Sequence, residues 1–99
     1  MNSIDTSIAL ITSESGNVFE DLGFNSQEAA KLKIKAQLMS QISEWIKEKQ
    51  LKQEDASHLL HVTRPRVSDI MRGKSGKFTI DALIYMLEHT GKHVTVHVS

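Results

Sequence analysis

The 99-residue chain has no cysteine and little proline or aromatic residue: one proline, one tryptophan, one tyrosine and three phenylalanines. Without cysteine, disulfides and thiolate zinc sites are excluded, which fits a reducing compartment. No apolar run approaches the roughly 18 residues of a membrane span. The N-terminus does not resemble a secretory signal. We therefore expect one small cytoplasmic domain with no membrane segment.

The net charge of zero hides an uneven distribution of charged residues. Residues 1–30 carry five acidic residues and no lysine or arginine, a net charge of −5. Residues 31–77 carry eight lysines and three arginines against five acidic residues, a net charge of +6. The basic centre suits a polyanion and the acidic front suits a basic partner, although ordinary solvated faces would give the same charges.

The hydrophobic pattern predicts a mainly α-helical fold that starts with one long helix. Asn25, with Glu28 three residues later, fits the start of a helix that ends near Lys49 or Gln50. One apolar face recurs at three- and four-residue steps: Ala29, Leu32, Ala36, Met39, Ile42 and Ile46. Trp45 lies beside this face and is expected to pack there. Residues 1–24 read mostly as loop, with Val18, Phe19, Leu22 and Phe24 able to dock elsewhere.

Three shorter helices are expected after the long one. The first covers about residues 53–60, with Ala56, Leu59 and Leu60 facing inward. The next follows Thr63 as N-cap, has Pro65 in its first turn and stops at Gly73, with Val67, Ile70 and Met71 on one face. The last follows Thr79 and ends before Gly91, with apolar residues Ile80, Leu83, Ile84 and Leu87.

The C-terminal residues 92–99 alternate strictly and predict a β-strand, with Val94, Val96 and Val98 on one side. A single strand needs a partner for its backbone. That partner is the same strand of a second protomer, the segment 8–11, or a sheet edge of another protein. We favour pairing with the same strand of a second protomer across a two-fold axis. The valines are equally compatible with the core of a single protomer.

Residues 51–73 predict a helix-turn-helix, in which the second helix inserts its N-terminal residues into a major groove about 12 Å wide. Arginine can bind guanine or phosphate, and hydroxyl or amide groups can contact phosphates. A helical hairpin with a solvated polar face is the simpler alternative. The candidate DNA-binding residues are Gln53, Thr63, Arg64, Arg66, Ser68, Asp69 and Lys74, with Arg64 and Arg66 as the main readers.

The stretches LKQEDAS at 51–57 and VTRPRVSDIMRGK at 62–74 resemble the helix-turn-helix of Xre/Cro-type regulators. The wider pattern is similar to the HigA-type antitoxin subgroup. It includes FEDLGF at 19–24, the helix start at 29–38, FTIDAL at 78–83 and GKHVTV at 91–96. The resemblance covers about residues 19–98. It implies a four- to five-helix Xre/Cro-like domain with a C-terminal strand used in dimerisation.

The resemblance also implies a function: a repressor that binds double-stranded operator DNA as a homodimer and neutralises a HigB/RelE-like RNase toxin. We expect an N-terminal acidic segment at 1–24, a DNA-binding domain at 25–91 and a C-terminal strand at 92–99. The acidic residues of 1–30, with Phe19 and Phe24 as anchors, are the candidate toxin-binding surface. A stand-alone Xre regulator without a toxin is the alternative, and a pure protein-interaction module is a third.

Two positions depart from the family pattern. Lys52 stands where threonine often caps the helix, and His61 stands where glycine is common. The missing cap at Lys52 is expected to cost about 1 kcal/mol. If the backbone at His61 is left-handed, histidine costs about 1 kcal/mol relative to glycine there. Neither the pair His58 and His61 nor the pair His93 and His97 has the three or four ligands of a metal site. No arrangement indicates an enzyme or a bound cofactor.

Overall fold

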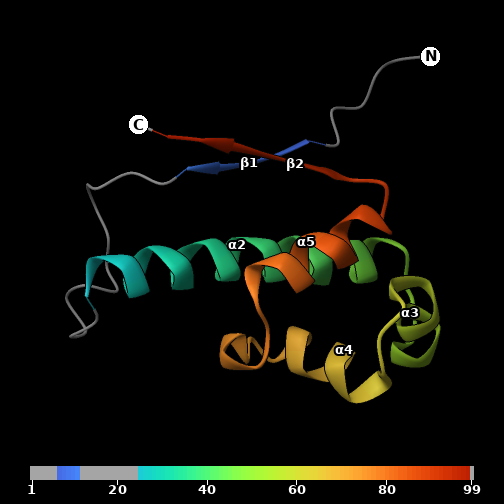
Figure 1. Cartoon of the computed structure of the whole chain (residues 1–99). Helices are drawn as coiled ribbons and strands as arrows, with labels where there is room; N and C mark the ends of the chain where they lie inside the picture. Colours follow the sequence, from blue (N-terminus) through green and yellow to red (C-terminus); the bar gives the residue numbers. More distant parts are fainter. Residues whose placement is uncertain (1–6, 12–24, 99) are drawn as a thin grey trace, which may run out of the picture.

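The computed structural model describes residues 7–11 and 25–98. Its elements, in chain order, are β1 (Ser7–Ile11), α2 (Ser26–Glu48), α3 (Gln53–Leu60), α4 (Arg64–Met71), the 3₁₀ helix η1 (Ser75–Lys77), α5 (Ile80–Glu88) and β2 (His93–His97). The strands lie over α2 and α5, while α3 and α4 lie on the opposite side of these helices (Figure 1). The mainly helical fold with a C-terminal strand confirms the prediction.

The helix ends follow the local sequence signals. The Asn25 side-chain oxygen accepts a hydrogen bond from the Glu28 N–H at 2.8 Å, and the Thr79 hydroxyl accepts one from the Ala82 N–H at 3.1 Å. The predicted caps at Asn25 and Thr79 are therefore confirmed. The third predicted cap, Thr63, occupies the N-cap position of α4 but makes no side-chain hydrogen bond there. Gly73 and Gly91 follow α4 and α5 with φ values of 75° and 86°, a region that glycine adopts without a Cβ penalty.

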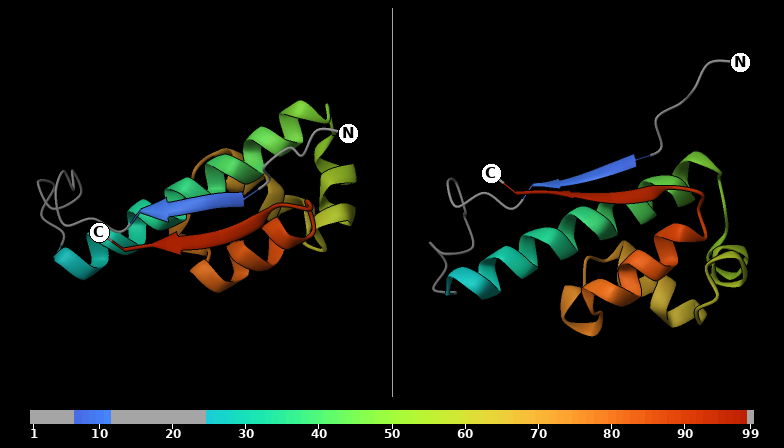
Figure 2. Two further views of the ribbon diagram at one scale, coloured as in Figure 1. Left: turned by 90° about the horizontal axis from the view of Figure 1, so that it is seen from above. Right: turned by 45° about the horizontal axis from the view of Figure 1, so that its top comes forward.

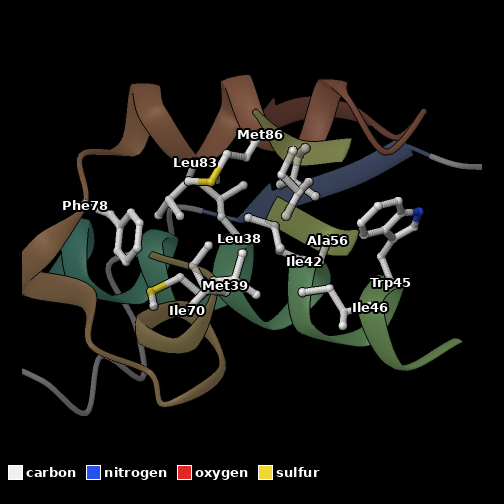
Figure 3. Packing of buried hydrophobic residues seen from close by; sticks show 13 residues of the cluster. Leu38, Met39, Ile42, Trp45, Ile46, Ala56, Ile70, Phe78, Leu83 and Met86 are labelled. Atoms are coloured by element: carbon white, nitrogen blue, oxygen red, sulfur yellow. The ribbon is translucent and has the colours of Figure 1, made fainter. Parts of the chain in front are cut away.

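A single apolar cluster holds α2, α3, α4 and α5 together (Figure 3). Its most deeply buried side chains come from all four helices, and Trp45 packs at one end of the cluster, as predicted. Two residues that were expected to face the core are exposed instead: Leu59 is 50% exposed and Met71 is 38% exposed. In α3, Ser57 is buried instead. Its hydroxyl donates a hydrogen bond to the Glu54 carbonyl oxygen at 2.6 Å, which offsets the cost of burying a polar group.

The long helix also buries more than the predicted face. Leu38 is fully buried and Trp45 is only 7% exposed, although neither belongs to the periodic set, while Ala36 of that set is exposed. The helix contacts α5, α4 and β1 on different sides, so its buried surface is wider than one stripe. Figure 2 shows α2 below the sheet, with α5 beside it.

The C-terminal strand pairs within its own chain. β2 runs parallel to β1, with Ser7 opposite His93 and Ile11 opposite His97. Within the chain, the partner is therefore the segment around 8–11, one of the three alternatives, although we expected it to be loop. Pairing with a second protomer, which we favoured, stays a prediction. Parallel strands need a long connection, and here the chain between them includes all the helices. Among the valines, Val94 packs on the core while Val96 is 60% and Val98 is 80% exposed.

Some predictions concern residues outside the described ranges. Val18, Phe19, Leu22 and Phe24 lie outside the described residues. The boundaries of the acidic segment and the DNA-binding domain stay predictions. Within the described residues, no helix is both long and apolar enough to cross a membrane.

Candidate nucleic-acid interface

A three-residue turn joins α3 to α4, and its first residue has a left-handed backbone. His61 has φ 59° and ψ 41°, and the N–H groups of His61 and Val62 both donate to the Ser57 carbonyl oxygen. This is the conformation in which histidine costs more than glycine, as expected from the sequence. The His61 ring contacts the His89 ring on α5, with 4.5 Å between centroids. The turn therefore connects the helix pair to α5.

Helix α4 has one buried face and one exposed face. Val67 and Ile70 are buried in the core at 0% and 1% exposure. At 100° per residue, the opposite face is centred on Pro65 and Arg72, with Ser68 between them. Figure 1 shows α4 with its outer side turned away from α2. An exposed helix face of this kind is what a major groove can accept.

The N-terminus of α4 differs from that of the other α-helices in the described ranges. Helices α2, α3 and α5 each carry acidic residues in the first turn, which the helix dipole favours. Helix α4 has none there. Thr63 occupies the N-cap position without a side-chain hydrogen bond, and Arg64 begins the helix. The positive end of α4 is therefore reinforced by positive charge and is suited to an anion such as a phosphate.

Arg66 is held by the chain itself. Its Nη1 donates to the Lys77 carbonyl oxygen at 2.6 Å, and its guanidinium lies 5.4 Å from the centroid of the Phe78 ring. Its side chain is therefore directed along the flank of α4 towards η1 and α5. The role of Arg66 as a main DNA reader stays a prediction.

The remaining predicted residues lie around α4 at different distances from its exposed face. The Asp69 carboxylate is 3.9 Å from the Lys77 ammonium and its side chain is 15% exposed. Lys74 is exposed in the loop after α4. Gln53 begins α3, and its amide nitrogen lies 4.0 Å from the Met71 sulfur, so it is beside the C-terminal end of α4. As expected, Lys52 provides no side-chain cap for α3.

Residues 18–99, most of the chain, match the protein family described as helix-turn-helix domain. The chain belongs to this family. No curated protein and no solved structure shows significant similarity to it. The helix-turn-helix family, together with the α3–turn–α4 geometry, identifies the protein as a DNA-binding regulator of the Xre-like type.

In this helix-turn-helix domain, Thr63, Arg64 and Ser68 lie at the N-terminus or on the exposed half of α4, whereas Arg66 and Asp69 face the loop. Arg72, which was not among the predicted site residues, also lies on this exposed face. It is the C-cap of α4 and lies seven residues, about two helical turns, after Pro65. The spacing 65, 68, 72 is the sequence signal for its position.

The histidines of the domain do not form a larger polar cluster. His58, His61, His93 and His97 are exposed. In the described part of the chain, no group of three or more histidine, aspartate or glutamate side chains could hold a metal ion. Besides His89, the ring arrangement at His61 includes Tyr85, whose ring centroid lies 4.5 Å from that of His89.

Proposed function

We propose that the protein is a sequence-specific transcriptional repressor and the antitoxin of a type II toxin–antitoxin pair. It binds its own operator as a homodimer and neutralises a HigB/RelE-like RNase. The helix-turn-helix domain supports the DNA-binding part of this proposal, and the sequence resemblance to HigA-type antitoxins supports the toxin part.

The N-terminus of α4 is the observation that carries the proposal. This end of the helix has no acidic residue in its first turn, no side-chain cap and an exposed arginine at its first position. Such an arrangement lowers the stability of an isolated helix, because the dipole and Arg64 repel each other. It becomes favourable when a phosphate or a guanine edge lies at the same place.

The exposed face of α4 extends this contact. Arg64 and Arg72 lie at the two ends of the helix, and Ser68 lies between them. We assign Arg64 and Arg72 to groove and phosphate contacts, and Thr63, Gln53 and Lys74 to backbone positioning. Arginine bound to guanine through two hydrogen bonds discriminates between bases, whereas single contacts to phosphate set orientation.

A homodimer would present two α4 helices to one DNA duplex. Two recognition helices must lie about 34 Å apart to contact successive major grooves. The sheet of β1 and β2 lies on the side of the molecule away from α4 (Figure 1). A second copy that joins there or beside α5 would leave both α4 helices accessible.

The acidic segment 1–24 is the part of the chain that we assign to the toxin. It carries four acidic residues and no lysine or arginine. A basic RNase would be attracted to this segment, which speeds association more than it raises affinity. Phe19 and Phe24 would supply apolar anchors.

A stand-alone Xre regulator is the second candidate, and the pairing of β1 with β2 favours it. This pairing connects residues 7–11 to the C-terminal strand of the same chain. In that case the N-terminal segment covers its own domain and binds no toxin.

The experiment that tests the DNA-binding part is a titration of the wild-type protein and Arg64→Ala against a duplex from its own promoter over a salt series. We expect specific binding that weakens steeply with salt, and a loss of about ten- to a hundredfold in Arg64→Ala. Lys31→Ala is the matched control, because it removes one exposed positive charge from α2. Equal, weak binding by all three proteins would identify a protein-interaction module instead.

The toxin part is tested separately with Glu20→Gln/Asp21→Asn. The double variant is expected to bind the operator normally and to associate more slowly with a small basic RNase encoded beside it. Absence of such a neighbouring gene, or no measurable complex with its product, would leave the stand-alone regulator.

A further inference from the structure

The loop between α4 and α5 is attached to α4 at two places. At its start, the Gly73 and Lys74 N–H groups donate to the carbonyl oxygens of Ile70 and Asp69 at 3.0 and 2.9 Å. At its end, Lys77 and Phe78 contact α4. Exposed Lys74 belongs to the first attachment, and its carbonyl oxygen accepts a hydrogen bond from the Lys77 N–H at 3.3 Å, so its position depends on both attachments.

Lys77 is held from both of its ends by residues one turn apart on α4. Arg66 donates to the Lys77 carbonyl oxygen at 2.6 Å, and the Asp69 carboxylate lies 3.9 Å from the Lys77 ammonium. Residues at i and i+3 of a helix lie on the same side. The two contacts therefore hold one residue of the loop against one flank of the helix.

The surroundings of Arg66 favour this arrangement. Its guanidinium lies over the Phe78 ring, and Phe78 is only 6% exposed. Arg66 also lines a cavity of about 240 Å³ with Val62, Phe78 and Tyr85. A guanidinium that donates to a carbonyl oxygen and stacks on an aromatic ring uses the planar shape that lysine lacks.

We propose that Arg66 is a positioning residue that fixes the loop 73–78 on α4, and that it supports DNA binding through Lys74 without reading a base itself. Asp69 completes this clamp on Lys77. This inference rests on the proposed DNA-binding surface, and it assigns Arg64 and Arg66, two residues apart, to different tasks.

The clamp is tested first in the full-length protein without DNA. Arg66→Met keeps an apolar stem over Phe78 but removes the donors. We expect amide hydrogen exchange in residues 73–78 to become about tenfold faster, with the core of α2 unchanged. Arg64→Met is the matched control and is expected to leave this loop unchanged. Unchanged exchange in Arg66→Met would overturn the clamp, whether or not the protein binds DNA.

Arg66→Lys is a second variant that keeps the charge. Lysine cannot reproduce the planar contact with both the carbonyl oxygen and the ring, so loop exchange is expected to stay faster than in the wild-type protein. Wild-type exchange in Arg66→Lys would show that charge alone holds the loop and would overturn the geometric argument.

The DNA part is tested with a double-mutant cycle on Arg66→Met and Lys74→Ala. If Arg66 acts through Lys74, Arg66→Met weakens binding in the wild-type background but has no further effect once Lys74 is alanine. The ranking of single-base operator variants should also stay the same in Arg66→Met. Additive losses or an altered ranking would make Arg66 a direct DNA reader and overturn the proposal. Failure of the wild-type protein to bind any duplex would count against the proposed function, while the exchange experiment still decides the clamp.

Discussion

Helix α4 and the other three α-helices of the described chain begin in different ways. In α2 and α5, Asn25 and Thr79 cap the helix through their side chains, and acidic residues follow in the first turn. Helix α3 lacks the side-chain cap but has Glu54 and Asp55. Helix α4 has neither device. A side-chain cap or an acidic first turn is therefore present at the other three α-helices of the described chain and absent from the helix expected to enter DNA.

This difference separates stability from function within one small domain. Caps and first-turn acidic residues each contribute about 0.3–2 kcal/mol to a helix. At the start of α4, an acidic residue would also repel phosphates. Since α4 is held by Val67 and Ile70 in the core, its N-terminus does not need the same support as an isolated helix.

The largest expected effect comes from Arg64→Glu, which gives α4 the acidic first turn of the other helices. We expect the affinity for the operator to fall by about a hundredfold or more, because a cation is replaced by an anion at the contact. The free energy of unfolding should rise by about 0.3–1 kcal/mol, because glutamate interacts favourably with the dipole. DNA titration and urea unfolding measure the two effects.

The control for this reversal is Glu28→Arg on α2, an exposed residue in the first turn. It should lower the free energy of unfolding by about 0.3–1 kcal/mol through the same dipole effect and leave operator affinity nearly unchanged. A destabilised Arg64→Glu protein would contradict the comparison between the helix starts.

The next effect concerns the two N-cap threonines. Thr79→Ala should lower the free energy of unfolding by about 1 kcal/mol, because the hydroxyl that accepts from Ala82 is lost. Thr63→Ala should change it by less than about 0.5 kcal/mol, because Thr63 makes no such bond. Thermal unfolding of both variants compares them directly.

If the Thr63 hydroxyl contacts a phosphate, Thr63→Ala weakens operator binding about two- to tenfold. Equal destabilisation by the two substitutions would mean that Thr63 caps α4 in solution, and the contrast between the helix starts would be lost.

A further effect on stability is expected at the two non-glycine residues of the described chain that have a left-handed backbone, Gln50 after α2 and His61 before α4. Gln50→Gly should raise the free energy of unfolding by about 0.5–1 kcal/mol, because the left-handed backbone costs glycine less. His61→Gly should raise the free energy of unfolding by a smaller amount, because it also removes the ring contact with His89. An equal gain in chemical denaturation would show that this contact contributes nothing.

The sequence predicted those parts of the fold that depend on neighbouring residues. The bounds of α3, the caps at Asn25 and Thr79 and the left-handed residue His61 follow from local signals. The inward face of α3 was only partly predicted: Leu59 is exposed and Ser57 is buried, because the position of α3 against the core decides which side of a short helix faces inward.

The candidate site shows the same limit. The sequence located the helix-turn-helix and the position of Arg64, and family membership supports the DNA-binding assignment. It gave no reason to separate Arg64 from Arg66, since the same residue type at two nearby positions has the same charge. The structure distinguishes the two arginines, because the Arg66 side chain donates to the carbonyl oxygen of Lys77, eleven residues further along the chain.

The order of the helices, the side-chain caps at Asn25 and Thr79 and the charge of the first turns were determined by the sequence alone, because these features involve residues within about one helical turn. The tertiary structure decided the partner of the C-terminal strand, the buried side of each helix and the direction of Arg66. These depend on contacts between distant residues, such as β1 with β2 and Arg66 with Lys77, which form only when the whole chain is packed.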